Sequence, residues 1–223
     1  MLDAIAVVLP ERFVALDLAC GPGAISQRLL ARFPHATSIA VDIDPVLLTL
    51  GQRALGTYAG RLRWLDADLR DSAWVATLGG MQVDTILSTT ALHWLPGNQL
   101  VRLYQDLAQL LRPNGVFLNG DHMRFGPQLP TFRTIAQTLY DRILHESFEQ
   151  RHGEDWRSWW DALAAEPGMA GLFEERARRF PEANHDATAP IFDLHVGALR
   201  DAGFSEVGVI WQRLDDLILL TGR

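Results

Sequence analysis

The chain has 223 residues, of which 48% are hydrophobic and 21% are charged, a composition typical of one folded domain with a substantial core. Its net charge is −7, and its arginines are scattered or locally paired with acids, as at 174–179. We therefore expect no nucleic-acid partner, because nucleic-acid binders usually carry a basic patch. The single cysteine, Cys20, excludes an internal disulfide and a cysteine metal cluster, which favours a cytoplasmic location. No apolar run approaches the roughly 20 residues of a membrane-spanning helix, so no membrane partner is expected.

The first half of the chain alternates short apolar segments with segments of helical periodicity. We expect strands at 13–18, 38–41, 62–65, 83–88 and 116–119. We expect helices at 24–33, from Pro45 onward, and at 99–111. Strands and helices that alternate at this spacing indicate parallel strands joined by right-handed crossovers. The sequence therefore predicts an α/β fold with a doubly wound, mostly parallel sheet.

The second half of the chain departs from this alternation. Residues 127–190 are expected to be helical and include a stripe of apolar residues, Phe132, Ile135, Leu139 and Ile143. A helix at 193–201 then precedes two strand-like segments, 207–211 and 217–220, with a turn at Asp215 and Asp216 between them. These two segments predict a terminal antiparallel hairpin, which brings the sheet to seven strands. Residues 1–223 are then one domain, in which residues 125–190 form an inserted helical lid.

A glycine-rich segment at 17–23, Asp-Leu-Ala-Cys-Gly-Pro-Gly, follows the first strand and opens a helix. Gly21 and Gly23 lack a Cβ atom, so the turn can be tight and a ligand can approach its backbone. The start of the helix offers free N–H groups. A nicotinamide dehydrogenase would have a third glycine where this chain has Ser26, which argues against that class of enzyme.

Acidic residues follow the second and third strands. Asp42 lies 19 positions after Gly23, where an acid in this type of fold holds a ribose diol, and Ile43 is placed beside it in the same site. Asp68 is expected to accept a hydrogen bond from the edge of an adenine ring, and Leu69 is expected to cover the face of that ring. These residues predict an adenosine-containing ligand.

The fourth strand is followed by residues 88–94, Ser-Thr-Thr-Ala-Leu-His-Trp. His93 is the best candidate for a general base and for a substrate contact, because ligands bind outside the carboxyl ends of the strands in such sheets. Structural packing beside Trp94 is the alternative. Asp121 and His122, after the fifth strand, are a second candidate pair facing the same site, with hydrogen bonding inside the loop as their alternative role.

Other residues are candidates for binding a substrate. Arg124 and Arg133 are candidates for binding a carboxylate, although each also suits a solvated surface. Trp156 is expected to form an aromatic wall over the substrate, with packing of its helix against the core as the alternative. The histidines and acids form no convincing ligand set, so no metal is expected.

In this order and spacing, the segments resemble the class I methyltransferases that depend on S-adenosylmethionine (SAM). Residues 16–23 resemble the first motif of that family, Asp42 and Asp68 match the acids of its second and third strands, and 83–88 followed by 91–94 resembles its fourth motif. The Leu-Arg-Pro-Asn-Gly turn at 111–115 and the Ala-Gly-Phe segment at 202–204 are also characteristic of the family. Among its subfamilies, the run at 91–96 is most similar to small-molecule methyltransferases of the trans-aconitate type.

Two features depart from the family pattern. Ala19 stands where the family often has glycine. Only about a dozen residues precede the first strand, where the family often has one or two helices, so the N-terminal part of the lid is expected to be short or absent.

The resemblance implies a Rossmann-like methyltransferase fold and the transfer of a methyl group from SAM to a small-molecule acceptor by in-line displacement, with S-adenosylhomocysteine (SAH) as the product. It implies no metal, and it fits a monomer or a homodimer. A non-catalytic SAM-binding module, and a transferase that moves another group from a sulfonium donor, are the alternatives. The residues expected to bind the cofactor are Asp17, Ala19, Gly21, Gly23, Asp42, Ile43, Asp68, Leu69 and Ser88. The residues expected to bind the acceptor are His93, His122, Arg124 and Trp156.

Overall fold

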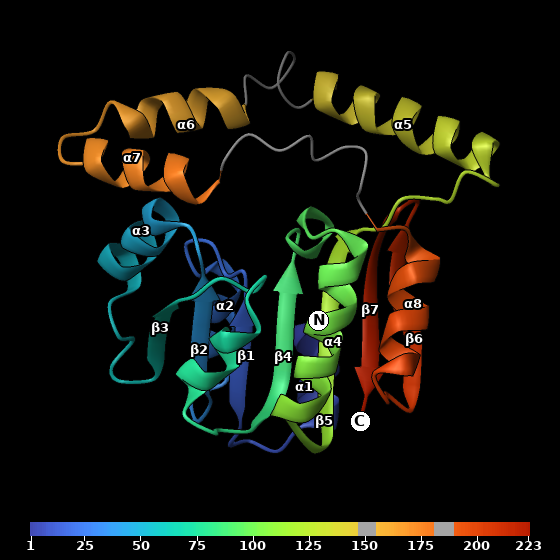
Figure 1. Cartoon of the computed structure of the whole chain (residues 1–223), viewed down its shortest axis with the longest axis horizontal. Helices are drawn as coiled ribbons and strands as arrows, with labels where there is room; N and C mark the ends of the chain where they lie inside the picture. The colour runs from blue at the N-terminus through green and yellow to red at the C-terminus, as the bar shows by residue number, and fades with distance from the viewer. Residues whose placement is uncertain (147–154, 181–189) are drawn as a thin grey trace.

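The computed structural model describes residues 1–146, 155–180 and 190–223; the segments 147–154 and 181–189, both inside the predicted insertion, lie outside the described residues. A seven-stranded sheet in the order β3-β2-β1-β4-β5-β7-β6 forms the centre of the molecule (Figure 1). Its strands are β1 Val14–Leu18, β2 Thr37–Asp42, β3 Leu62–Asp66, β4 Val83–Thr89, β5 Leu111–His122, β6 Glu206–Arg213 and β7 Asp216–Gly222.

The pairing of the strands confirms the predicted α/β class. The first five strands in the chain run parallel to one another, and β1 lies between β2 and β4. The order of the strands therefore reverses at β1, which makes the edge beyond its carboxyl end the place where ligands bind in such sheets. Strand β7 pairs antiparallel with both β5 and β6, so the chain ends in the predicted hairpin.

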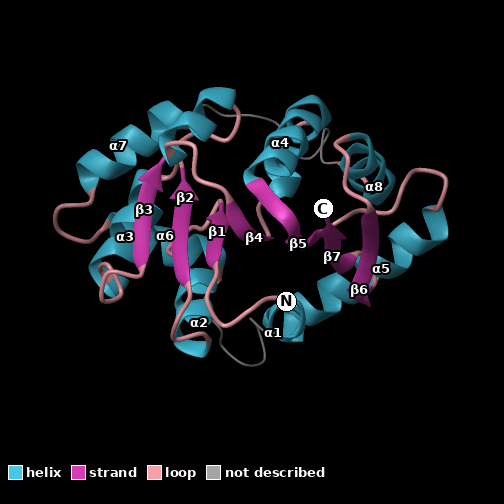
Figure 2. Ribbon diagram, turned by 90° about the horizontal axis from the view of Figure 1, so that it is seen from below, coloured by secondary structure: helices cyan, strands magenta, loops and turns pink. Residues whose placement is uncertain are grey.

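Helices cover both faces of the sheet (Figure 2). Helices α1 Leu2–Val8, α2 Ala24–Arg32 and α3 Pro45–Leu55 lie on one face. The 3-10 helix η1 Ser72–Leu78, α4 Gly97–Leu110 and α8 Phe192–Asp201 lie on the other; the shorter 3-10 helix η2 Leu92–Trp94 follows β4. Successive side chains of a strand point to opposite faces, and β1 shows this directly, because Ala15 joins the core under α2 while Leu16 joins the core under α4.

The residues before the first strand, where the N-terminal part of the lid is expected to be short or absent, form helix α1. Its Ile5 is fully buried and belongs to the same core as Leu29 of α2 and Leu118 of β5. This helix therefore contributes to the packing of the sheet.

Two turns differ from the sequence-based prediction. The hairpin turns at Leu214 and Asp215, one residue earlier than predicted, and Leu214 adopts a left-handed φ of 58° that leucine rarely takes. The predicted turn at 111–115 lies within β5 as an irregular excursion, since the pairing with β4 jumps from Leu111 to Val116 and Asn114 has a φ of 65°.

The inserted helices α5 Pro130–Leu144, α6 Trp156–Ala164 and α7 Ala170–Arg179 lie beyond the carboxyl ends of the parallel strands (Figure 1). The apolar stripe of α5 is largely uncovered, with Phe132 at 53% and Ile135 at 46% exposure, and Ala136 is the buried residue of that helix. Within α6 and α7 no residue is buried. The insertion is therefore held to the rest of the domain by few apolar contacts.

A buried polar pair joins α4 to α8. The hydroxyl of Tyr104 lies 2.6 Å from Nδ1 of His195, and both side chains are fully buried. Burial lowers the pKa of His195 from 6.5 to about 4, because the charged imidazolium loses its hydration.

This pair makes stability sensitive to acid. As the pH falls below 6.5, His195 takes up a proton in the unfolded chain, whereas in the folded chain it stays neutral until the pH approaches 4. The folded state therefore loses stability between these two pH values. We expect the native chain to lose about 2 kcal/mol more free energy of unfolding between pH 7 and pH 5 than the His195→Gln variant, since one pKa unit corresponds to about 1.4 kcal/mol. Urea unfolding at the two pH values measures this. His35→Gln, at an exposed position, is the control, and equal pH dependence in all three proteins would refute the expectation.

Candidate active site

The glycine-rich turn joins the end of β1 to the start of α2. Ala19, Gly21 and Gly23 adopt left-handed φ angles of 49°, 54° and 82°. A Cβ atom on Gly21 would have only Leu47 Cδ1 near it, at 3.8 Å, so that side of the turn is open. A Cβ atom on Gly23 would meet the Trp64 ring at 2.5 Å, so the other side packs closely on β3. The turn therefore leaves an open approach to its backbone at Gly21.

Asp17, at the end of β1, is hydrogen-bonded to the first turn of α2. Its Oδ2 atom accepts hydrogen bonds from the backbone N–H of Ser26 (2.9 Å) and from the Ser26 hydroxyl (2.7 Å). Burial raises the pKa of Asp17 to about 7. Ser26, which the sequence analysis used only to argue against a dehydrogenase, is thus the residue that ties α2 to β1. A direct contact between Asp17 and a cofactor stays a prediction.

Asp42 connects the turn to the second strand. Its Oδ2 atom accepts a hydrogen bond from the N–H of Gly21 (2.7 Å), and its Oδ1 atom accepts one from the N–H of Asp44 (2.8 Å). Burial raises the pKa of Asp42, and these N–H groups act in the opposite direction. An ionised carboxylate has about four acceptor sites, so two remain for the hydroxyls of a ribose.

Asp68 is already paired in the structure. The Nε atom of Arg70 lies 2.8 Å from Oδ1 and 3.0 Å from Oδ2 of Asp68. Burial alone would raise the pKa of Asp68, but the hydrogen bonds and charge of Arg70 outweigh it and hold the pKa below its usual value. Arg70 carries no recognisable signal in the sequence, and an adenine ring would share Asp68 with it.

Three further residues from the predicted cofactor set lie around the same strand ends. The carbonyl oxygen of Ile43 accepts a hydrogen bond from Arg179 (2.8 Å). Leu69 is partly buried against the core. The hydroxyl of Ser88 is fully buried and donates to the Leu18 carbonyl (3.1 Å), so it is used inside the sheet. Their contacts with a cofactor stay predictions.

His93 and Asp121 form a hydrogen-bonded pair at the carboxyl ends of β4 and β5. His93 Nδ1 lies 2.6 Å from Asp121 Oδ1, and the His93 N–H donates to Asp121 Oδ2 (3.0 Å). Asp121 is buried, and His93 is half-buried. Because Nδ1 faces the carboxylate, Nε2 is the nitrogen left for another partner. The two residues had been considered as separate candidates, and the structure brings them together; the predicted packing of His93 beside Trp94 is present as well, with ring centres 5.0 Å apart.

His122 extends this pair towards α5. Its ring meets that of His93 edge-on at 5.8 Å and that of Tyr140 at 6.3 Å. Its Nδ1 atom also pairs with Asp216 at the start of β7. The insertion therefore contacts the His93–Asp121 pair through Tyr140 and His122.

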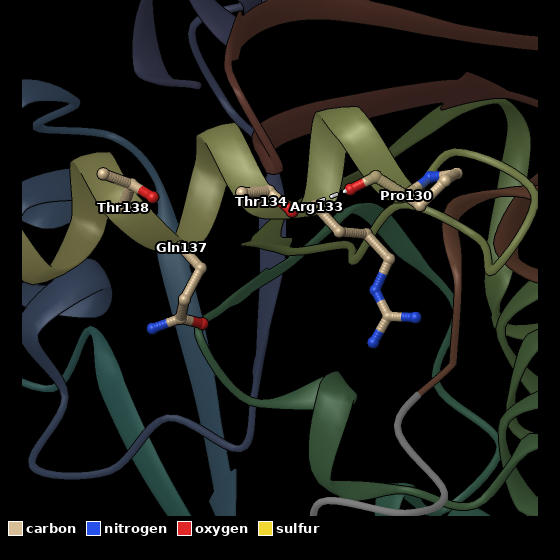
Figure 3. Close-up of a pocket in the computed structure, with 5 residues that line it drawn as sticks. All are labelled: Pro130, Arg133, Thr134, Gln137 and Thr138. Atoms are coloured by element: carbon tan, nitrogen blue, oxygen red, sulfur yellow. Dashed lines mark hydrogen bonds between the residues drawn. The ribbon is translucent and has the colours of Figure 1, made fainter.

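A cavity of about 470 Å³ lies along one face of α5 (Figure 3). It is lined by residues at helical spacing, Pro130, Arg133, Thr134, Gln137 and Thr138. Figure 3 shows the side chains of Arg133 and Gln137 reaching to the same side of the helix. Tyr140 follows Gln137 by one turn, so this face of α5 leads towards His122 and His93. The pocket is wide open to solvent.

The other predicted acceptor residues lie in more open positions. Arg124 is exposed. Trp156 is 69% exposed and stacks on Trp159, with ring centres 5.6 Å apart and planes 14° apart. Trp160 meets both of these rings edge-on, so the three tryptophans form a cluster within α6. Acceptor contacts of Arg124 and Trp156 stay predictions.

Across residues 1–146, 155–180 and 190–223, no group of three or more His, Cys, Asp or Glu side chains is arranged to hold a metal ion. In the same residues, no helix combines the length and the apolar character needed to cross a membrane.

Residues 15–115 match a family model described as a methyltransferase domain. It is 34% identical over 110 residues to trans-aconitate 2-methyltransferase of Azoarcus sp. (strain BH72), a match that covers 49% of this chain and 39% of that protein. It is 27% identical over 162 residues to malonyl-[acyl-carrier protein] O-methyltransferase of Paenibacillus sp. (strain JDR-2), covering 71% of this chain and 55% of that protein.

Solved methyltransferase structures share the fold. An O-methyltransferase family protein from Burkholderia thailandensis superposes with a TM-score of 0.60 at 18% identity, covering 100% of this chain and 55% of that chain. Human N-acetylserotonin methyltransferase in complex with SAM superposes with a TM-score of 0.55 at 12% identity, covering 99% of this chain and 51% of that chain. The chain therefore spans little more than half the length of these proteins, and 39% to 55% of the two curated relatives.

The residues at the turn fit the adenosine part of SAM, which the family implies as cofactor. The open side of Gly21 lies next to the carboxylate of Asp42, which has acceptor sites left for a ribose. Asp68 follows the neighbouring strand β3, so ribose and base can be held at adjacent strand ends.

The Ala19 position offers a direct test of strain in the turn. A left-handed conformation costs an L-residue roughly 1–2 kcal/mol, and glycine escapes most of this cost. We expect Ala19→Gly to raise the free energy of unfolding by about 0.5–1 kcal/mol and to leave the affinity for SAH within about twofold of the native value. Ala31→Gly, inside helix α2, should instead destabilise the domain by roughly 0.5–1 kcal/mol. Urea unfolding checks both, and destabilisation by Ala19→Gly would show that the turn is not strained there.

Proposed function

We propose that this chain transfers the methyl group of SAM to a small-molecule acceptor, with His93 and Asp121 beside the transferred group. The observation that carries the proposal is the His93–Asp121 pair, which lies at the ends of β4 and β5. Strand β4 is the neighbour of β1, and β1 leads into the glycine turn. With adenosine held towards β2 and β3, the sulfonium end of SAM would face β4. A buried acid paired with a histidine at that point favours catalysis over simple binding of SAM.

When bound, SAM supplies a methyl group on a cationic sulfur. In-line displacement transfers this methyl group to the acceptor, and the sulfur leaves as part of SAH. The chain's own residues orient the acceptor and accept its proton. Asp121 holds the His93 ring through Nδ1, so Nε2 can take the proton of a hydroxyl or amine acceptor. The Asp121 carboxylate then stabilises the imidazolium that forms.

The acceptor we propose carries an acidic group. The guanidinium of Arg133 reaches into the α5 cavity and, within the part of the chain that the structure describes, has no hydrogen-bond or ion-pair partner. Because the chain as a whole carries a net charge of −7, the guanidinium of Arg133 is a local positive charge that can attract an anion to this place. The relatives named for trans-aconitate and for a malonyl group, both derived from carboxylic acids, suggest the same class of acceptor.

Removing the base tests the catalytic role. We expect His93→Ala to lower kcat by roughly 10²–10⁴ for an acceptor that loses a proton, because general base catalysis contributes about that much. Asp121→Asn should lower kcat as well, since the ring loses its orienting carboxylate. The affinity for SAH, measured by calorimetry, should stay within about twofold in both variants, because neither residue lies on the adenosine side.

The measurement is transfer of radiolabelled methyl groups to a panel of acids, malonyl thioesters, phenols and amines. Unchanged turnover in His93→Ala would exclude the base role. SAH binding by the native chain with no labelled product from any acceptor class would instead favour a SAM-binding module.

Substitution of Arg133 tests whether the acceptor is an anion. We expect Arg133→Gln to raise KM for an acidic acceptor roughly tenfold or more with a small effect on kcat, because a hydrogen bond to a charged group contributes about 1.5–3 kcal/mol. Arg142→Gln, on the same helix but outside the cavity lining, is the matched control. Equal effects of the two substitutions, or an equal effect on neutral and acidic acceptors, would argue against an anion site.

A further inference from the structure

Helix α7 lies over α3, with α6 on its outer side (Figure 1). Neither α6 nor α7 buries a residue of its own, so apolar packing does little to hold them. The last turn of α7 instead carries three arginines, Arg176, Arg178 and Arg179. Two of these reach the ends of β2 and β3, beside the residues expected to hold adenosine.

Arg176 pairs with a buried acid. Its Nε atom lies 2.6 Å from Oδ2 of Asp44, and its guanidinium lies over the ring of Trp160 at 4.2 Å. Asp44 is buried, and its other oxygen, Oδ1, accepts the N–H of Val46 (2.9 Å) at the start of α3. A buried carboxylate that loses its cation is strongly destabilising, so Asp44 depends on α7.

Arg179 holds the residue before Asp44. One of its terminal nitrogens donates to the carbonyl of Ile43 (2.8 Å) and to Oδ1 of Asp66 (2.6 Å). Arg179 thus holds the carbonyl of the peptide between residues 43 and 44, and Arg176 holds the side chain of Asp44. The N–H of this same peptide, that of Asp44, donates to Oδ1 of Asp42.

The two contacts therefore meet at the carboxylate that faces the glycine turn. The ends of β2 and β3 bring together four acids, Asp42, Asp44, Asp66 and Asp68. Arg176 and Arg179 neutralise two of them, which favours an ionised Asp42 ready to accept ribose hydroxyls. Without α7, Asp44 would repel Asp42 at close range.

We propose that α7 is a latch on the adenosine half of the cofactor site: Arg176 and Arg179 position residues 42–44, so that docking of α6 and α7 and binding of SAM or SAH stabilise each other. The inference rests on the proposed function for the identity of the cofactor. Coupling between two events is reciprocal, so each must strengthen the other by the same factor. In this arrangement Trp160 acts as a platform for Arg176.

The test compares arginines of a single helical turn. We expect Arg176→Gln and Arg179→Gln to weaken SAH binding, measured by calorimetry on the full chain, by about fivefold or more, the lower limit of typical coupling between sites. Arg178→Gln is the matched control, because Arg178 pairs with Glu175 of its own helix and is 67% exposed. Its affinity for SAH should stay within about twofold of the native value. Asp44→Asn, which keeps an oxygen to cap α3 but loses the charge, should weaken binding in the same way as Arg176→Gln.

A second readout does not depend on activity. In the native chain, SAH should slow tryptic cleavage within α6 and α7; this protection should be lost in Arg176→Gln and retained in Arg178→Gln. Thermal unfolding identifies any variant that is not folded, and Asp44→Asn then decides the question. If Arg179→Gln and Asp44→Asn both bind SAH with native affinity, the latch is overturned and the proposed function is not. An equal loss of SAH affinity in Arg178→Gln would overturn the latch in the same way. Failure of the native chain to bind SAH would overturn the proposed function, and the latch with it.

Discussion

The carboxylate of Asp42 is the interaction on which the site depends. Its two oxygens accept N–H groups from Gly21 and Asp44, which joins the end of β2 to the glycine turn after β1 and to the loop that starts α3. A carboxylate so far from water is stabilised mainly by such hydrogen bonds, because burial penalises its charge. The first two sequence motifs are therefore one structural unit: if either N–H moved, the acid and the turn would both lose their position.

This unit divides the edge of the sheet into two regions with different chemistry. Towards β2 and β3 the side chains are carboxylates paired with arginines, an arrangement that holds a polar ligand in place. Towards β4 and β5 the carboxylate of Asp121 faces a histidine. Because β1 lies between these regions, the cofactor of the proposed function would touch both, with its adenosine on one side and its reacting group on the other.

Much of the fold was predictable from the sequence, because strand length and helical periodicity are local. The pairs that define the site are not local. His93 and Asp121 are 28 residues apart and meet only because β4 and β5 are neighbours in register, with Ser88 beside Asn119. Arg176 and Asp44 are 132 residues apart; the sequence pattern showed only pairing within α7, which holds for Arg178 and Glu175. The left-handed Leu214 is a tertiary override of local preference, so the hairpin turn was placed one residue late.

The partners of the buried acids also distinguish acids with a structural role from an acid suited to take part in a reaction. Asp17 faces Ser26, a neutral partner, and burial raises the pKa of Asp17 to about 7. Asp42 faces backbone N–H groups, and Asp44 faces the guanidinium of Arg176. Of these acids, Asp121 alone pairs with an imidazole, a side chain that enzymes use as a general base. The end of β4 is therefore the place at this edge of the sheet where, under the proposed function, a proton can pass from the acceptor to the protein.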